Sequence, residues 1–150
     1  MPAERDAAAL ALTYLQEHQV MTLATEGPAG LWAAAVFYVN AGYDLYFLSA
    51  GHTRHAQNIA ATNHAAGTIQ EDYKDWPAIK GIQLSGSVTL LEGNERTEAI
   101  ERYQQKYPFI ASADDRMQRA LDRVNWYRLQ PDTFYFIDNG LGLGHRDTII

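Results

Sequence analysis

The sequence contains no cysteine. This absence excludes disulfide bonds, thiolate nucleophiles and cysteine-ligated metal sites. The sequence also lacks a run of about 18 apolar residues, which a membrane-spanning helix needs, so no membrane insertion is expected. The polar start, Met1 to Asp6, lacks the basic and apolar segments of a signal peptide, and the expected location is the cytoplasm.

Basic residues are scarce as well. The chain has 12 lysines and arginines against 18 aspartates and glutamates, which gives a net charge of −6. Proteins that bind nucleic acid generally present a basic face, so a nucleic-acid partner is not expected. The acidic balance still allows a small basic pocket for a phosphorylated cofactor. The length of 150 residues suits a single domain, residues 1–150.

The spacing of apolar residues predicts an antiparallel β protein with flanking helices. The connections between the first strands are short and rich in glycine, which favours a meander closed into a barrel over a parallel sheet. Leu31–Val39 is almost continuously apolar and is expected to be buried on both faces. The expected strands are Val20–Thr25, Leu31–Val39, Asp44–Ser49, His64–Gln70, Lys80–Leu91 and Asp132–Asp138.

Helices are expected where apolar residues recur at helical spacing without glycine or proline. Tyr107-Pro108-Phe109 separates the last two of them, and the glycine-rich tail after Asn139 is expected to be irregular. The expected helices are Ala3–His18, a short helix capped by Thr53 and ending at Ala61, Glu95–Lys106, and Ser112–Val124.

The most informative segment is the junction of the third expected strand with the short helix. The strand ends at Leu48 and Ser49, Gly51 breaks it, and Thr53-Arg54 opens the helix. Free N–H groups at a helix start, a hydroxyl and a guanidinium together suit a phosphate group. The alternative is that Thr53 only caps the helix and Arg54 lies in solvent, and spacing alone does not decide between the two.

The segment Thr53-Arg54-His55-Ala56-Gln57-Asn58-Ile59 after this strand resembles the phosphate-binding segment of the pyridoxamine 5′-phosphate oxidase-like superfamily of FMN-binding split β-barrels. The strand through Ala33–Tyr38 resembles the one that lines the flavin, and Lys80–Val88 resembles the long strand that follows. The ending Phe136–Gly144 is similar to that of a small bacterial subgroup. The resemblance covers the whole chain and implies a split β-barrel, FMN as cofactor, and a homodimer with the flavin between the chains.

The resemblance implies FMN-binding roles for ten residues, and His55 departs from it because many members have lysine there. Gln83 corresponds to a glutamine that reaches the flavin from the partner chain or the ring edge, in a register two residues from the commonest one. The implied cofactor-binding residues are Ala34, Ala35, Val36, Phe37, Leu48, Ser49, Thr53, Arg54, His55 and Gln83.

A further departure concerns the substrate. Pyridoxamine phosphate oxidases carry a basic C-terminal segment that holds the substrate phosphate, whereas this chain ends in Gly144-His145-Arg146-Asp147-Thr148. Oxidation of vitamin B6 is therefore not the favoured function. The favoured one is FMN-dependent oxidation or reduction of an unknown small substrate or a reduced nicotinamide, with no catalytic acid or base identified.

Three alternatives keep the fold. They are a flavin-binding module without enzymatic activity, a haem-binding relative, and a protein that binds the deazaflavin F420 instead of FMN. His145 is the candidate haem ligand, although a solvated tail histidine is the simpler interpretation. No metal site is expected from His52, His55 and His64, because they lack familiar zinc spacing. Trp76 either stacks on the flavin or packs on a neighbour, and packing is the favoured interpretation.

Overall fold

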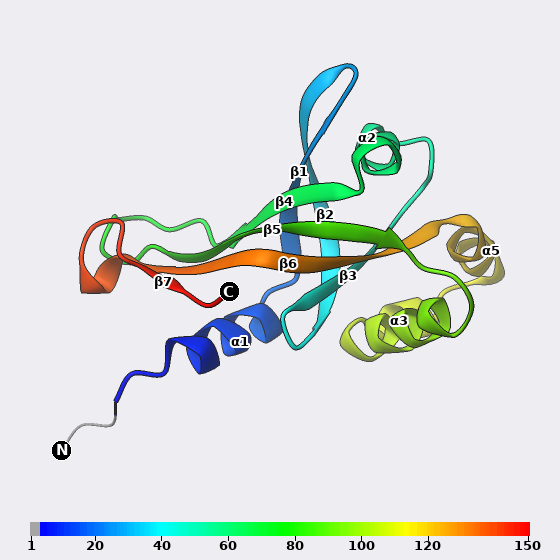
Figure 1. The fold of residues 1–150 in the computed structure, drawn as a ribbon. Helices are drawn as coiled ribbons and strands as arrows, with labels where there is room; N and C mark the ends of the chain where they lie inside the picture. The colour runs from blue at the N-terminus through cyan, green and yellow to red at the C-terminus, as the bar shows by residue number, and fades with distance from the viewer. Residues whose placement is uncertain (1–3) are drawn as a thin grey trace.

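The computed structural model describes residues 4–150, so the expected helix start at Ala3 lies outside the described residues. An antiparallel sheet forms the body of the molecule (Figure 1). Its strands are β1 (Val20–Gly27), β2 (Gly30–Ala41), β3 (Asp44–Ser49), β4 (His64–Gln70), β5 (Lys80–Leu90), β6 (Asn125–Asp138) and β7 (Arg146–Thr148). Their order is β3-β2-β1-β4-β5-β6-β7, and β3 also pairs with β6. That pairing closes six strands into a split β-barrel, as the sequence predicted.

Helices lie outside the barrel (Figure 1). The α1 helix runs below the sheet, α2 lies beside the β1–β2 hairpin, and α3 and α5 lie together at the opposite end from η1. The Asp6 side chain accepts a hydrogen bond from Ala9 N and so caps α1. The bounds are α1 (Ala7–Glu17), α2 (Arg54–Thr62), α3 (Gly93–Lys106), α4 (Pro108–Ala111), α5 (Asp115–Arg123) and the 3-10 helix η1 (Asn139–Leu141).

The barrel interior is filled by alternate residues of its strands, because successive side chains of a strand point to opposite faces. These side chains form one continuous apolar core with residues from α1 and α2. The largest of the core residues that are almost completely buried include Tyr38, Phe47, Phe134, Leu15, Met21 and Leu23.

A second apolar cluster lies between α3 and the outer side of β3 and β6. Tyr103 of α3 meets the edge of Trp126, with 5.2 Å between the ring centroids. Lys106 extends from the last turn of α3, donates to the backbone oxygen of His18 and lies 4.3 Å from the ring centroid of Tyr38. Burial lowers the pKa of Lys106 to about 8. These contacts attach α3 to both the barrel and the α1–β1 connection.

The expectation that Leu31–Val39 is buried on both faces is wrong. Leu31 is 77% exposed and Phe37 is 49% exposed. Strand β4 pairs with β1 only at Thr22–Ala24, so the outer half of the β1–β2 hairpin projects beyond the barrel as a two-stranded ribbon (Figure 1). One face of this ribbon meets α2, and the other is left apolar and exposed.

The last barrel strand is longer than expected. It begins at Asn125, not at Asp132, and Pro131 lies within it. Proline is tolerated because the β5–β6 register shifts between Ser85 and Gly86, opposite Pro131. Three further differences are local: Pro108–Ala111 is helical, the helix expected over Ser112–Val124 is confined to Asp115–Arg123, and the tail contains η1 and β7.

Gly86 provides a test of this irregularity. A Cβ at Gly86 would lie 2.0 Å from the backbone oxygen of Gln130 and 2.7 Å from Pro131 Cα. Because these atoms are backbone, Gly86→Ala should lower the free energy of unfolding by about 1–3 kcal/mol. Urea denaturation would measure the change, with Ser87→Ala at the adjacent exposed position as the control. A Gly86→Ala protein as stable as the parent would show that the bulge can relax.

Candidate functional site

The junction of β3 and α2 forms a compact polar cluster. Thr53 caps α2, as expected: its Oγ1 accepts from Ala56 N at 3.3 Å and donates to the backbone oxygen of Ala50 at 2.9 Å. Ser49 Oγ lies 2.9 Å from Thr53 Oγ1 and 2.7 Å from His55 Nε2. Hydroxyl and imidazole groups from the end of a strand and the first turn of a helix therefore share one site.

His55 is half-buried in this cluster. Burial lowers the pKa of the imidazole below its usual value, which favours the neutral form. A neutral ring next to Ser49 contributes a hydrogen bond without a positive charge. The residue therefore orients the serine hydroxyl, and Arg54 is left as the cation of this segment.

Arg54 extends from the first turn of α2 toward the β1–β2 hairpin. Its Nη2 donates to the backbone oxygen of Ala29 at 2.8 Å, and its Cζ lies 4.4 Å from the ring centroid of Trp32. The Nε atom is buried and has no hydrogen-bond partner among residues 4–150. Arg54 is thus held by the protein, whereas the simpler interpretation placed it free in solvent.

The α2 helix packs against the hairpin through contacts that the sequence did not indicate. Asn58 Nδ2 donates to Thr25 Oγ1 at 3.1 Å in a buried position. A Cβ at Gly27 would lie 2.0 Å from Asn58 Oδ1, so any larger residue there would have to displace the buried Asn58 amide. Arg54 and Asn58 are four residues apart and therefore share one helix face. The sequence therefore contained a sign that these two residues lie on the same side of α2. It did not indicate that this side packs against the β1–β2 hairpin.

The four candidates on β2 divide between the two faces of the sheet. Ala34 and Val36 pair with Leu23 and Met21, whose side chains lie in the barrel core. Ala35 and Phe37 pair with Thr22 and Val20 on the outer face. Alternation along the strand therefore prevents all four side chains from contacting one ligand.

Two candidates lie apart from the polar cluster. Leu48 is partly buried against the apolar cluster beneath α3, although its neighbour Ser49 belongs to the site. Gln83 is exposed on β5, where it pairs with Thr68 and Tyr135. Gln83 pairs with Tyr135 of β6, whereas Ser49 pairs with Asn125, ten residues earlier on the same strand, which is roughly 30 Å along it.

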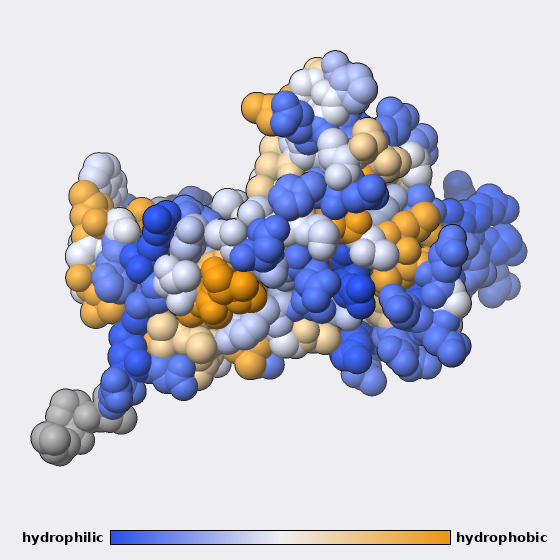
Figure 2. Space-filling model, in the orientation of Figure 1, coloured by the Kyte–Doolittle hydropathy of each residue, from blue (hydrophilic) through white to orange (hydrophobic). Residues whose placement is uncertain are grey.

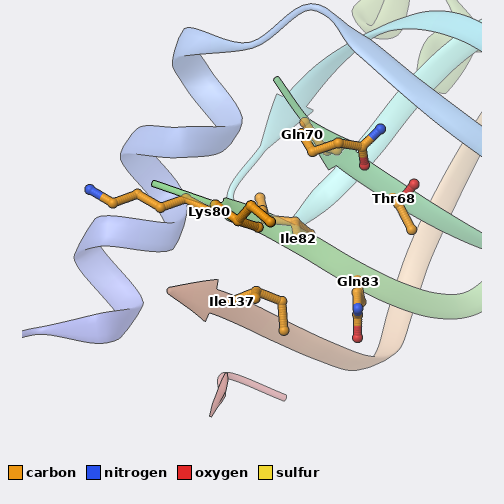
Figure 3. A pocket seen from close by; sticks show the side chains of 9 residues that line it. Thr68, Gln70, Lys80, Ile82, Gln83 and Ile137 are labelled. Carbon is orange, nitrogen blue, oxygen red and sulfur yellow. The ribbon is translucent and has the colours of Figure 1, made fainter. Parts of the chain in front are cut away.

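Gln83 belongs to a separate shallow surface (Figure 3). This surface has a cavity of about 180 Å³ formed by the outer sides of β4 and β5, the residue before β5, and Ile137 of β6. Within one chain, Gln83 therefore cannot meet Ser49, Thr53 and Arg54. The lining residues are Thr68, Ile69, Gln70, Ile79, Lys80, Gly81, Ile82, Gln83 and Ile137.

The remaining candidates lie near the opposite end of the barrel. Trp76 is 67% exposed in the β4–β5 loop of the single chain, so stacking on a flavin and packing on a neighbour both stay predictions. His145 lies between η1 and β7, with Nε2 3.4 Å from Asp147 Oδ1. Glu71 accepts from Tyr73 and lies 3.0 Å from His18 Nε2. These contacts link the β4–β5 loop to the end of α1, while the Glu71 side chain stays 59% exposed.

Neither a metal site nor a membrane span is found in the part of the chain that the structure describes. No three histidine, aspartate or glutamate side chains there lie close enough to bind one ion. Likewise, no described helix has the length and hydropathy to cross a bilayer.

Comparison with known proteins identifies the family. The sequence profile described as pyridoxamine 5′-phosphate oxidase matches residues 8–138. This chain belongs to that family. It is also similar to a UPF0306 protein of Klebsiella pneumoniae, with 32% identity over 138 residues, which cover 89% of this chain and 86% of the relative.

Two solved structures show the same fold. A haem-binding protein from Mycobacterium smegmatis superposes with a TM-score of 0.79 at 23% identity, and the match covers 98% of this chain. It covers only 59% of the mycobacterial chain, so that protein has a large part without a counterpart here. The haem storage protein HutZ of Vibrio cholerae gives a TM-score of 0.71 at 19% identity, over 85% of this chain and 92% of HutZ.

The lowered pKa of His55 predicts a pH dependence of stability. The unfolded chain binds a proton on His55 below about pH 6.5, whereas the folded chain resists that protonation. Stability should therefore fall as pH drops below 6.5, and His55→Gln should reduce this loss. Urea denaturation at pH 7 and at pH 5.5 would measure it, with His64→Gln as an exposed control. Equal pH dependence in the parent and His55→Gln would contradict the prediction.

Proposed function

We propose that this chain binds FMN and acts as a flavin-dependent oxidoreductase on a small substrate. One observation carries the proposal: the β3–α2 junction gathers two hydroxyl groups, the start of a nine-residue helix, and a buried guanidinium nitrogen without a partner in the described chain. A phosphate ester accepts several hydrogen bonds and is stabilised by the positive end of a helix dipole. Membership of the pyridoxamine 5′-phosphate oxidase family supports the same ligand class.

The donor set fits the phosphate of FMN. Ser49, Thr53 and Arg54 would hold this group, with His55 orienting the Ser49 hydroxyl. The flavin, when bound, would supply the hydride or electron transfer with a small substrate or a reduced nicotinamide. The protein residues would anchor the cofactor and exclude water from it, and no side chain is assigned as a general acid or base.

A homodimer is part of the proposal. Gln83 is roughly 30 Å along β6 from Ser49 of its own chain, so a contact with the same cofactor requires the partner subunit. The outer face of β2 is exposed at Leu31 and Phe37, and Val20 beside Phe37 is 43% exposed. An apolar sheet face of this kind suits association with a second copy.

Haem is the second candidate ligand. The observation favouring it is His145, whose imidazole side chain is 36% exposed and lies 3.4 Å from Asp147 Oδ1. A carboxylate that orients a histidine ring is a frequent feature of metal-ligating imidazoles. The mycobacterial and Vibrio neighbours are named as haem-binding and haem storage proteins, which makes haem a ligand to test. At 23% and 19% identity, the similarity itself shows only a shared fold.

The absorbance spectrum of the purified protein tests these alternatives. Flavin bands support FMN, a Soret band supports haem, and the distinct absorption of a deazaflavin supports F420. Oxidation of a reduced nicotinamide by the flavin-loaded protein would then distinguish an oxidoreductase from a flavin-binding module. Protein that binds none of these cofactors when they are added would contradict the proposal.

Arg54 tests the phosphate anchor. Hydrogen bonds to charged groups contribute about 1.5–3 kcal/mol, so Arg54→Ala should weaken FMN binding roughly ten- to a hundredfold. Riboflavin lacks the phosphate, and its affinity should change much less. Arg54→Lys should restore part of the loss because it keeps the charge. Thr53→Ala should cost about 1 kcal/mol, part of it as helix destabilisation. Flavin fluorescence titrations would measure these affinities. Equal affinity of the parent protein for FMN and riboflavin would contradict the proposed phosphate site.

The proposed dimer is tested by placing a charge on the exposed face of β2. Leu31→Lys should shift the sedimentation coefficient toward the monomer, because an unpaired lysine in an apolar interface is costly. Leu143→Lys is the matched control, since Leu31 and Leu143 are 77% and 72% exposed and Leu143 lies beyond η1. Figure 2 shows apolar residues also at the η1 end. If only Leu143→Lys disrupts the dimer, the interface lies at that end and not on β2. A parent protein that is monomeric at micromolar concentration would contradict the dimer.

A further inference from the structure

The guanidinium of Arg54 is held by the β1–β2 hairpin as well as by its own helix. Its Cζ lies 4.4 Å from the ring centroid of Trp32, and its Nη2 donates to Ala29 at 2.8 Å. Trp32 pairs with Thr25, whose hydroxyl accepts from Asn58 of α2. The Trp32 side chain is therefore on the face of the hairpin that meets α2, opposite the exposed face at Leu31.

The hairpin packs closely against the helix that carries Arg54. Gly27 approaches Asn58 so closely that a Cβ there would overlap the amide oxygen. Asn58 and Arg54 follow each other along one side of α2, so the packing that fixes Asn58 also fixes the position of the Arg54 backbone. The hairpin end is consequently close to the helix start, although it projects beyond the barrel (Figure 1).

Holding the arginine has a consequence for ligand binding. An arginine side chain free in solvent loses rotamer freedom when it binds an anion, which reduces affinity. The stacked ring and the Ala29 carbonyl have already fixed Arg54, and its buried Nε has no partner within residues 4–150. The remaining donors of the guanidinium can then bind a phosphate at a smaller entropic cost.

We propose that Trp32 is a positioning residue of the phosphate site, and that its ring orients the Arg54 guanidinium for the phosphate of the cofactor. This inference rests on the proposed FMN site and deepens it. It assigns a binding role to the β1–β2 hairpin, which lies outside the strand–helix junction. Because Trp32 acts through Arg54, its removal should affect ligands that carry the phosphate and spare those that lack it.

The experiment compares FMN and riboflavin in fluorescence titrations of Trp32→Leu. A cation–π contact at a partly exposed site is worth about 0.5–1 kcal/mol, so FMN affinity should fall roughly two- to fivefold. Riboflavin affinity should stay at the parent value. Trp32→Met also removes the ring but keeps more of the side-chain length, and it should show the same loss of FMN affinity. It replaces Trp32→Leu in the experiment if that variant does not fold. Trp76→Leu, at another exposed tryptophan, is the control and should leave the ratio of the two affinities unchanged.

A double-mutant cycle decides whether the effect passes through Arg54. In an Arg54→Ala background, Trp32→Leu should cause no further loss of FMN affinity, since the side chain that Trp32 positions is already gone. Additive losses would overturn the inference, and so would equal losses for FMN and riboflavin or an unchanged FMN affinity in Trp32→Leu and Trp32→Met. A parent protein that does not prefer FMN to riboflavin would overturn the proposed phosphate site and this inference with it. A parent that prefers FMN through Arg54, but not through Trp32, would overturn the inference alone.

Discussion

The pairing of β3 with β6 is the interaction on which the rest of the structure depends. It joins Ser49 to Asn125 and Leu45 to Leu129, so a short early strand closes against a long late one and completes the barrel. Without this pairing the sheet would have an open edge, and β3 would keep a hydrogen-bonded neighbour on one side only. The same closure presents the outer side of β3 and β6 to α3, which builds the second apolar cluster.

The barrel also determines where the candidate site lies. Strand β3 ends at Ser49 beside β6, and the chain then turns into α2, which packs on the hairpin of the first two strands. The site is therefore supported on one side by the closed barrel and on the other by the hairpin. Polar groups at this position are held by rigid elements, which reduces the freedom that a bound ligand must remove.

One surface and one distance support the proposed homodimer. The outer face of β2 is apolar and exposed, while a closed barrel normally turns such residues inward. On one chain, Gln83 and Ser49 of the proposed phosphate anchor pair with β6 at positions ten residues apart, roughly 30 Å along the strand. The proposed dimer would cover the exposed face of β2. It would also place Gln83 of one subunit near the phosphate anchor of the other.

The sequence by itself determined the order of the six barrel strands and the longer helices, the Thr53 cap and an antiparallel barrel, because these depend on local apolar spacing and on turn and cap residues. The split-barrel form of this barrel came from the family resemblance. It did not determine the course of β6, since the bulge that accommodates Pro131 forms only against Gly86 of another strand. It also did not show that the outer face of β2 is exposed at Leu31 and Phe37, because a strand buried on both faces and a strand with one exposed apolar face have the same composition. Only the tertiary structure placed Arg54 on Trp32 and separated Gln83 from Ser49, because these relations depend on how distant strands pair and not on sequence spacing.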